Sequence, residues 1–308
     1  MLEPFCDRLQ EAIQRTRTPV MVGLDPRYEL LPSVLRSQGG QAAILTRATA
    51  YGQFCRGVID VVASLVPIVK PQAAFFEELG PAGMTVLGEV IDYAQAKGLL
   101  VVLDGKRNDI GSTAAAYAAG YLGRDGQSPW GADALTVSPY LGDDSLQPFV
   151  DVAVTRAAGV FVLVKTSNPG GRLFQDLSSE GRTVYEHVAA VVEDLARRSI
   201  GKCGYGAVGA VVGATYPDQL AELRGQMPHA WLLVPGYGSQ GGTAQQVAGA
   251  FDARGLGAVI NNSRGILFAY RDGEYAKTYG EARWQAAVEA ATRRMIEDLR
   301  AETPAARL

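Results

Sequence analysis

Eight short apolar runs alternate with segments of helix length along this chain of 308 residues. The runs are rich in valine, leucine and isoleucine and mostly do not alternate with polar residues, as is typical of parallel strands buried on both faces. Each run ends in polar or glycine-rich residues. The runs span residues 19–25, 65–72, 99–106, 132–140, 159–167, 206–214, 230–238 and 257–265.

The segments between these runs predict helices, among them 83–97, 181–198 and 241–254. At the start of the chain, Phe5, Leu9 and Ile13 have the spacing of one helix face and predict an amphipathic helix over about residues 1–17. A last helix is predicted over 281–301. Residues 167–180 are predicted to form a long irregular loop, and loops of that length in compact domains often cover or bind a ligand.

Strand–helix alternation predicts parallel pairing with right-handed crossovers. Eight such units are the number in a (β/α)8 TIM barrel, which is typically about 250 residues long. The alternative is an open doubly wound sheet, but the glycine fingerprint that usually follows its first strand is replaced here by GLDPRYEL. Because no linker interrupts the alternation, we expect residues 1–308 to form a single α/β barrel domain.

Composition and charge indicate which partners and which cellular compartment to expect. The net charge is only −3 and no basic block is present, so nothing favours a nucleic-acid partner. No window of eighteen apolar residues predicts a membrane span. The three cysteines, Cys6, Cys55 and Cys203, are far apart and in no pair motif, which argues against a disulfide framework and against zinc. A reducing cytoplasm is therefore the expected location.

Charged residues gather at the ends of the first three predicted strands, on the barrel face where active sites lie. Asp25, Lys70, Asp104 and Lys106 are at these ends, and Asp109 follows just beyond. Residues 104 and 106 are two apart on a strand, so their side chains are expected to share one face. A structural salt-bridge network is the alternative. The remaining strands are expected to deliver Ser138, Lys165, Thr166, Ser167, Gly213 and Thr215.

The ends of the last two strands have a different chemistry. Barrels frequently bind phosphate between the loops after strands seven and eight. Glycines 236, 238, 241 and 242 permit close backbone approach, Gln240 offers an amide donor, and Arg264 offers a planar guanidinium. These residues predict a phosphate site, although a plain glycine turn beside a surface arginine is an alternative.

The charged array favours one reaction type. A lysine held between carboxylates stays protonated, so it is a poor Schiff-base nucleophile and a good proton donor. A fixed carboxylate beside it would repel a substrate carboxylate, and the lysine could protonate the carbanion left after carbon dioxide departs. No motif for pyridoxal phosphate, thiamine or a metal is present. His187 and His229 are expected to be structural.

The stretch DGKRNDIGST at 104–113 resembles the signature of orotidine 5′-phosphate decarboxylase, in the longer bacterial branch of that family. Further motifs support the resemblance in order: GLDP, KPQAAFFE, TVSPYLG, KTSNPG, VGAT, VPGYGSQGG and NNSRG. The resemblance covers about residues 20–267. It implies a cofactor-free barrel enzyme that forms a homodimer and converts orotidine 5′-phosphate to UMP.

The resemblance also implies roles for the charged residues. Asp104 would lie against the substrate carboxylate, and Lys106 would stabilise and protonate the C6 carbanion. Lys70 would orient Asp104 and touch the ribose. Asp109 would reach into the partner subunit's site, and two neighbours would accompany it, Ile110 and Thr113.

The remaining implied contacts are with the substrate. Asp25 would bind a ribose hydroxyl, Ser167 would contact the pyrimidine, and Pro235 would lie near the base. Gln240 and Arg264 would hold the phosphate. No metal ligand is implied.

Two other functions are compatible with parts of this pattern. One is a magnesium-dependent sugar-phosphate decarboxylase or aldolase with a similar Asp-x-Lys-x-x-Asp core, although Lys70 would repel the metal. The other is a barrel that binds a nucleotide phosphate as a sensor or scaffold without catalysis.

Overall fold

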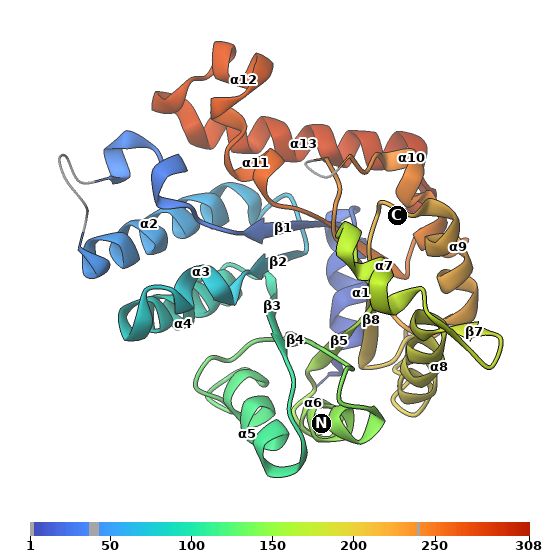
Figure 1. Ribbon diagram of the computed structural model, residues 1–308. Helices are drawn as coiled ribbons and strands as arrows, with labels where there is room; N and C mark the ends of the chain where they lie inside the picture. Colours follow the sequence, from blue (N-terminus) through green and yellow to red (C-terminus); the bar gives the residue numbers. More distant parts are fainter. Residues whose placement is uncertain (1–2, 37–42, 239–240) are drawn as a thin grey trace.

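The computed structural model describes residues 3–36, 43–238 and 241–308. Eight parallel strands close into a barrel in the order β1-β10-β9-β8-β5-β4-β3-β2, which confirms the predicted (β/α)8 fold (Figure 1). Each strand lies within one of the eight apolar runs or extends it by one residue. The strands are β1 Val20–Leu24, β2 Ile68–Pro71, β3 Leu100–Arg107, β4 Ala134–Val137, β5 Gly159–Lys165, β8 Val208–Val212, β9 Leu232–Val234 and β10 Ala258–Asn262.

Helices surround the barrel and connect its strands (Figure 1). The long ones agree with the sequence pattern to within a few residues at each end. The α-helices are α1 Phe5–Thr16, α2 Ile44–Val62, α3 Ala73–Glu77, α4 Gly80–Ala96, α5 Gly111–Tyr121, α6 Asp143–Thr155, α7 Arg172–Gln175, α8 Val184–Arg197, α9 Pro217–Gln226, α10 Ala244–Val247, α11 Arg264–Leu267, α12 Gly273–Thr278 and α13 Trp284–Glu302.

The core has two layers, and the inner one includes side chains of α1. Side chains such as Met21, Ile68 and Trp231 point into the barrel and pack with α1. The ring of Phe5 meets the ring of Phe161 edge to face at 6.1 Å. A Cβ at Gly159 would lie 2.3 Å from the Phe5 ring, so only glycine permits this approach. Helix α1 therefore closes the amino-terminal end of the barrel.

Two predictions for local structure need correction. The predicted helix 241–254 is wrong: α10 covers only Ala244–Val247 and tightens into a 3-10 turn over Ala248–Ala250. Close packing against α9 accompanies this ending, because a Cβ at Gly249 would be 2.7 Å from the Cβ of Ala221. The segment 167–180 is not wholly irregular, since it contains a 3-10 turn, helix α7 and strand β6 Ser178–Ser179, which pairs with β7 Arg182–Thr183.

Among the described residues, no helix is both long enough and apolar enough to cross a membrane.

Candidate active site

A cavity of about 410 Å³ opens at the carboxyl ends of the strands, within the size range of small-molecule sites. The cavity combines charged and polar side chains with an apolar floor. It brings together seven of the predicted site residues: Asp25, Lys70, Asp104, Lys106, Ser167, Pro235 and Arg264.

Asp104 lies between two lysines at the edge of this cavity. Its Oδ2 accepts a hydrogen bond from Lys70 Nζ at 2.8 Å, and its Oδ1 accepts one from Lys106 Nζ at 2.7 Å. Gln72 Nε2 also donates to Oδ2, at 3.2 Å. Lys70 is 3% exposed, whereas the Lys106 side chain is 46% exposed. The sequence predicted a lysine between carboxylates, but in the structure one carboxylate lies between two ammonium groups.

Lys106 reaches Asp104 through an irregularity in β3. The pairing of β3 with β4 shifts register between Leu103 and Arg107, and Lys106 has a φ of +45°. A non-glycine residue in this left-handed region costs about 1–3 kcal/mol and is typical of functional sites. Thr136 on β4 holds the arrangement, because its Oγ1 accepts from Lys106 N at 2.9 Å and donates to Asp104 Oδ1 at 2.8 Å.

Burial and charge act in opposite directions on these groups. Burial alone would raise the pKa of Asp104, but the positive charges of Lys70 and Lys106 outweigh it and hold that pKa far below its usual range. Burial would lower the pKa of Lys70, but the negative charges of Asp104 and Asp25 outweigh it and raise that pKa. Asp104 is therefore ionised and Lys70 cationic at neutral pH.

Two buried acceptor atoms of the cavity have no hydrogen-bond donor among the described residues. They are Oδ1 of Asp25 and Oδ1 of Asn261. Leaving a buried polar atom unpaired costs about 1–3 kcal/mol, so such atoms mark places where a ligand can donate. Asp25 follows β1 and Asn261 is on β10, and these strands are neighbours in the barrel. Ligand hydroxyl groups fit both acceptors.

The floor of the cavity is apolar. Leu163, Val211, Leu233 and Pro235 line it from three neighbouring strands and the loop after β9. Ser167 also lines the cavity. A flat heterocycle could pack on this surface while its polar edge meets Ser167.

The part of the cavity at the ends of β9 and β10 suits an anion. Arg264 and Ser263 line it after β10, and Gly236 lines it after β9. Gly236 has a φ of +101°, a conformation that glycine adopts without strain. A Cβ at Gly242 would be 2.8 Å from the carbonyl oxygen of Gly236, so this turn is closely packed. The predicted contact Gln240 lies outside the described residues.

Three predicted site residues lie elsewhere. The described residues that line the cavity do not include Asp109, Ile110 or Thr113. Ile110 is 57% exposed, and Asp109 Oδ1 accepts a hydrogen bond from the Ile110 backbone N–H. The three residues are around the start of α5, on the surface beside the site.

Lys165 also lies outside the cavity, although the end of β5 was expected to deliver it. Its side chain is fully buried, forms an ion pair with Asp176, and lies 5.0 and 5.1 Å from the ring centroids of Tyr185 and Tyr216. Together with hydrogen bonds between Gln175 and Thr166, this pair fastens α7 to the end of β5. Neither Ser138 nor Thr215 lines the cavity.

Sequence reasoning missed several polar residues of the cavity, namely Gln72, Thr136, Asn168 and Asn261. Thr136 and Asn261 are inside the apolar runs, before the polar residues Ser138 and Arg264 near the ends of those runs. Asn168 follows β5 inside the KTSNPG motif, and Gln72 ends the run of β2.

Comparison with known proteins decides the family. The model of the orotidine 5′-phosphate decarboxylase / HUMPS family matches residues 18–279. The chain belongs to this family. Its sequence is 59% identical to an orotidine 5′-phosphate decarboxylase of Rhodopirellula baltica, over 96% of this chain and 99% of that protein.

Other relatives agree. An orotidine 5′-phosphate decarboxylase of Caldicellulosiruptor bescii is 39% identical, covering 87% of this chain and 90% of that protein. The crystal structure of a putative orotidine 5′-phosphate decarboxylase from Streptomyces avermitilis superposes with a TM-score of 0.79 at 38% identity, covering 98% and 96% of the two chains. The protein is thus an enzyme, a decarboxylase of this family.

Proposed function

We propose that this enzyme converts orotidine 5′-phosphate to UMP and carbon dioxide in pyrimidine biosynthesis, without a cofactor. The observation that carries the proposal is the ionised Asp104 carboxylate, hydrogen-bonded at 2.8 Å by Lys70 and at 2.7 Å by Lys106 at the cavity. Arg264 lines the same cavity.

The cavity can hold each part of the substrate. The phosphate would bind Arg264 and the turn at Gly236, with Gln240 as a further donor. The pyrimidine would pack on the apolar floor near Pro235, with its polar edge at Ser167. A ribose hydroxyl would donate to Asp25, whose Oδ1 is buried and has no donor among the residues that the structure describes.

Lys106 would perform the proton transfer. The substrate carboxylate would lie beside Asp104, and like charges at that distance disfavour the bound ground state. The bond between the ring carbon C6 and the carboxylate breaks, carbon dioxide leaves, and the electron pair stays on C6. Lys106 Nζ then donates a proton to C6. Solvent can restore that proton, because the Lys106 side chain is 46% exposed.

Preorganised charge would supply much of the rate enhancement. Enzymes lower barriers by about 8–23 kcal/mol, and a carbanion without an electron sink should need the upper part of that range. Lys106 is already fixed by Asp104 and Thr136, so it need not reorganise as negative charge develops. Binding energy from the remote phosphate at Arg264 would hold the pyrimidine in place during this step.

We further propose a homodimer with shared sites. Asp109, Ile110 and Thr113 would enter the partner subunit's cavity rather than their own. Exposed apolar side chains near them support an interface here: Ile110, Tyr117, Tyr140 and Leu141 are 57%, 37%, 80% and 46% exposed. A dimer would cover this surface.

We also propose that residues 1–308 form one domain and that the enzyme is cytoplasmic. Helix α1 packs on the inward-facing side chains at one end of the barrel, and α13 packs on α2, where the rings of Phe54 and Trp284 are 5.1 Å apart. The three cysteines are free thiols, which suits a reducing compartment.

Turnover of orotidine 5′-phosphate, assayed with and without a chelator, tests the proposal. The purified enzyme should release UMP and carbon dioxide in equal amounts at the same initial rate in both conditions. Activity that disappears with chelator and returns with magnesium would favour a metal-dependent enzyme. Tight UMP binding without any turnover would favour a nucleotide-binding protein and refute the proposal.

A further inference from the structure

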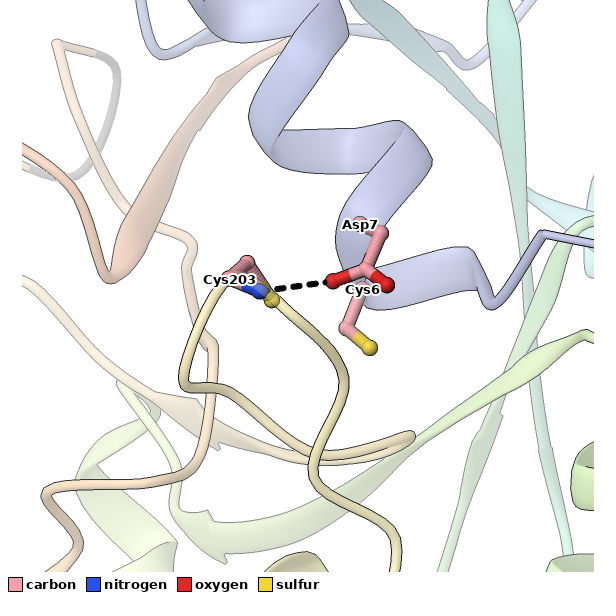
Figure 2. Close-up of side chains that lie close together, drawn as sticks. All are labelled: Cys6, Asp7 and Cys203. Atoms are coloured by element: carbon pink, nitrogen blue, oxygen red, sulfur yellow. Dashed lines mark hydrogen bonds between the residues drawn. The ribbon is translucent and has the colours of Figure 1, made fainter.

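Two of the three cysteines meet at the end of the barrel opposite the active site. Cys6 and Asp7 are in the first turn of α1, and Cys203 is in the loop between α8 and β8 (Figure 2). The two sulfur atoms and a carboxylate oxygen of Asp7 all lie within 4.8 Å of one another. Cys6, Asp7 and Cys203 are 0%, 5% and 6% exposed. Sequence spacing argued against zinc, but the barrel topology brings together residues that are far apart in the chain.

Backbone hydrogen bonds hold this cluster in place. Asp7 Oδ2 accepts from Lys202 N at 3.1 Å, and Asp7 Oδ1 accepts from Cys203 N at 2.8 Å. Within the loop, Gly201 N donates to Tyr205 O at 2.9 Å. A Cβ at Gly201 would be only 2.5 Å from Asp7 Oδ1, so the loop and the carboxylate are in close contact. The donor atoms are therefore preorganised.

The donor set suits a zinc-class cation. Zinc binds thiolate sulfur at about 2.3 Å and oxygen at about 2.0–2.2 Å, usually as a tetrahedron, which separates a sulfur from an oxygen ligand by about 3.6 Å. The Tyr205 carbonyl oxygen lies 3.6 Å from Cys203 Sγ and can serve as a fourth ligand. A carboxylate has about four lone-pair sites. The two backbone bonds to Asp7 therefore leave it free to bind a metal.

Charge is close to balanced in such a site. Two thiolates and one carboxylate against a divalent cation leave one negative charge, and the positive charge of Lys202 acts on Asp7.

We propose that Cys6, Asp7 and Cys203, together with the Tyr205 carbonyl, bind a soft divalent cation of the zinc class. On binding, each thiol releases its proton to solvent and its sulfur bonds to the metal. No electron transfer is involved. The ion would cross-link α1 to the loop before β8 and so stabilise the closed end of the barrel. It would take no part in the decarboxylation.

Cadmium is a direct probe, because thiolate ligands give it a charge-transfer band in the ultraviolet. The full-length, reduced and metal-free enzyme should bind about one equivalent of Cd²⁺ per chain with this band, and should retain about one Zn²⁺ after desalting. Zinc at a hundredfold excess over its Kd should raise Tm by about 4 °C. Magnesium should do neither.

Variants locate the ligands. Cys55 is buried alone in the outer core and is the matched control. Cys55→Ser should keep the full cadmium band, whereas Cys6→Ser and Cys203→Ser should each lose most of it. Because the chain has three cysteines, a full band in Cys55→Ser identifies the other two even if their serine variants do not fold.

Two results would overturn the proposal. One is that the wild type takes up no metal, whether or not a disulfide oxidant joins Cys6 to Cys203. The other is that a folded Cys55→Ser variant loses the cadmium charge-transfer band. Decarboxylation, assayed well below Tm, should be the same with and without zinc, so this test and the test of the proposed function fail independently.

Discussion

The hydroxyl of Thr136 offers a sharp test of how the charged array is held. Its Oγ1 donates to Asp104 Oδ1 at 2.8 Å and accepts from Lys106 N at 2.9 Å, and the residue is 1% exposed. Thr136→Val keeps the shape of the side chain and removes both hydrogen bonds. It leaves the Lys106 backbone N–H, which has the strained φ of +45°, without its partner.

The magnitude follows from the lost bond to the charged Asp104. Such hydrogen bonds contribute about 1.5–3 kcal/mol. If that energy serves to orient Asp104 and Lys106 in the transition state, kcat falls about 10- to 150-fold, since about 1.4 kcal/mol is tenfold. KM should change little, because Thr136 hydrogen-bonds Asp104 and Lys106, whereas the substrate phosphate is proposed to bind Arg264.

Thr136→Ser is the matched control, since it keeps the hydroxyl and loses only a methyl group. Steady-state turnover of orotidine 5′-phosphate should place the serine variant within about threefold of wild type and the valine variant far below it. If a folded Thr136→Val retained kcat within about twofold of wild type, Thr136 would not orient the array.

The remaining predictions concern the phosphate, the dimer and the loop after β5. Arg264→Ala should lower kcat/KM for orotidine 5′-phosphate at least about 100-fold and leave kcat/KM for the much slower, phosphate-free orotidine nearly unchanged. Equal losses for both substrates would show that Arg264 does not bind the phosphate. Mixed dimers of Asp109→Ala and Lys106→Ala subunits should regain activity, because one of their two sites is intact; inactive heterodimers of proven composition would place each site within one chain. Lys165→Ala should release α7 and raise KM at least about tenfold, whereas Lys165→Arg, which can still pair with Asp176, should restore it; unchanged KM in Lys165→Ala would show that the pair does not position the loop.

Much of the fold follows from the sequence because the eight strands are buried on both faces. Continuous apolar runs such as 99–106 and 206–214 are easily recognised, and their alternation with helices leaves few topologies. The helix predicted over 241–254 failed for a tertiary reason, since close packing of Gly249 on α9 accompanies its early end.

The charged residues of the site could be predicted from the sequence, but the residues that hold them in place could not. Asp104 and Lys106 do share one side, although a register shift and a left-handed Lys106 produce this geometry rather than regular strand alternation. Thr136 was overlooked because threonine is common in strands and carries no charge. Lys165 resembled a site residue by its position, but the pairing with Asp176 depends on how α7 folds back, which strand periodicity does not encode.

The proximity of Cys6 and Cys203 shows the same limit. Motif spacing detects metal ligands that are close in the chain, whereas these cysteines are brought together by closure of the barrel around α1. No local pattern marks such a pair.

The central claim is that Lys106 stabilises and protonates the carbon that loses the carboxylate, and the turnover of Lys106→Ala tests it most directly. Asp104 remains paired with Lys70 in this variant, so the enzyme should fold and bind UMP within about tenfold of wild-type affinity. We predict that its kcat falls by about 10⁴-fold or more, since both a proton donor and a preorganised positive charge are lost. A folded variant that binds UMP normally and retains kcat within about tenfold of wild type would contradict the account.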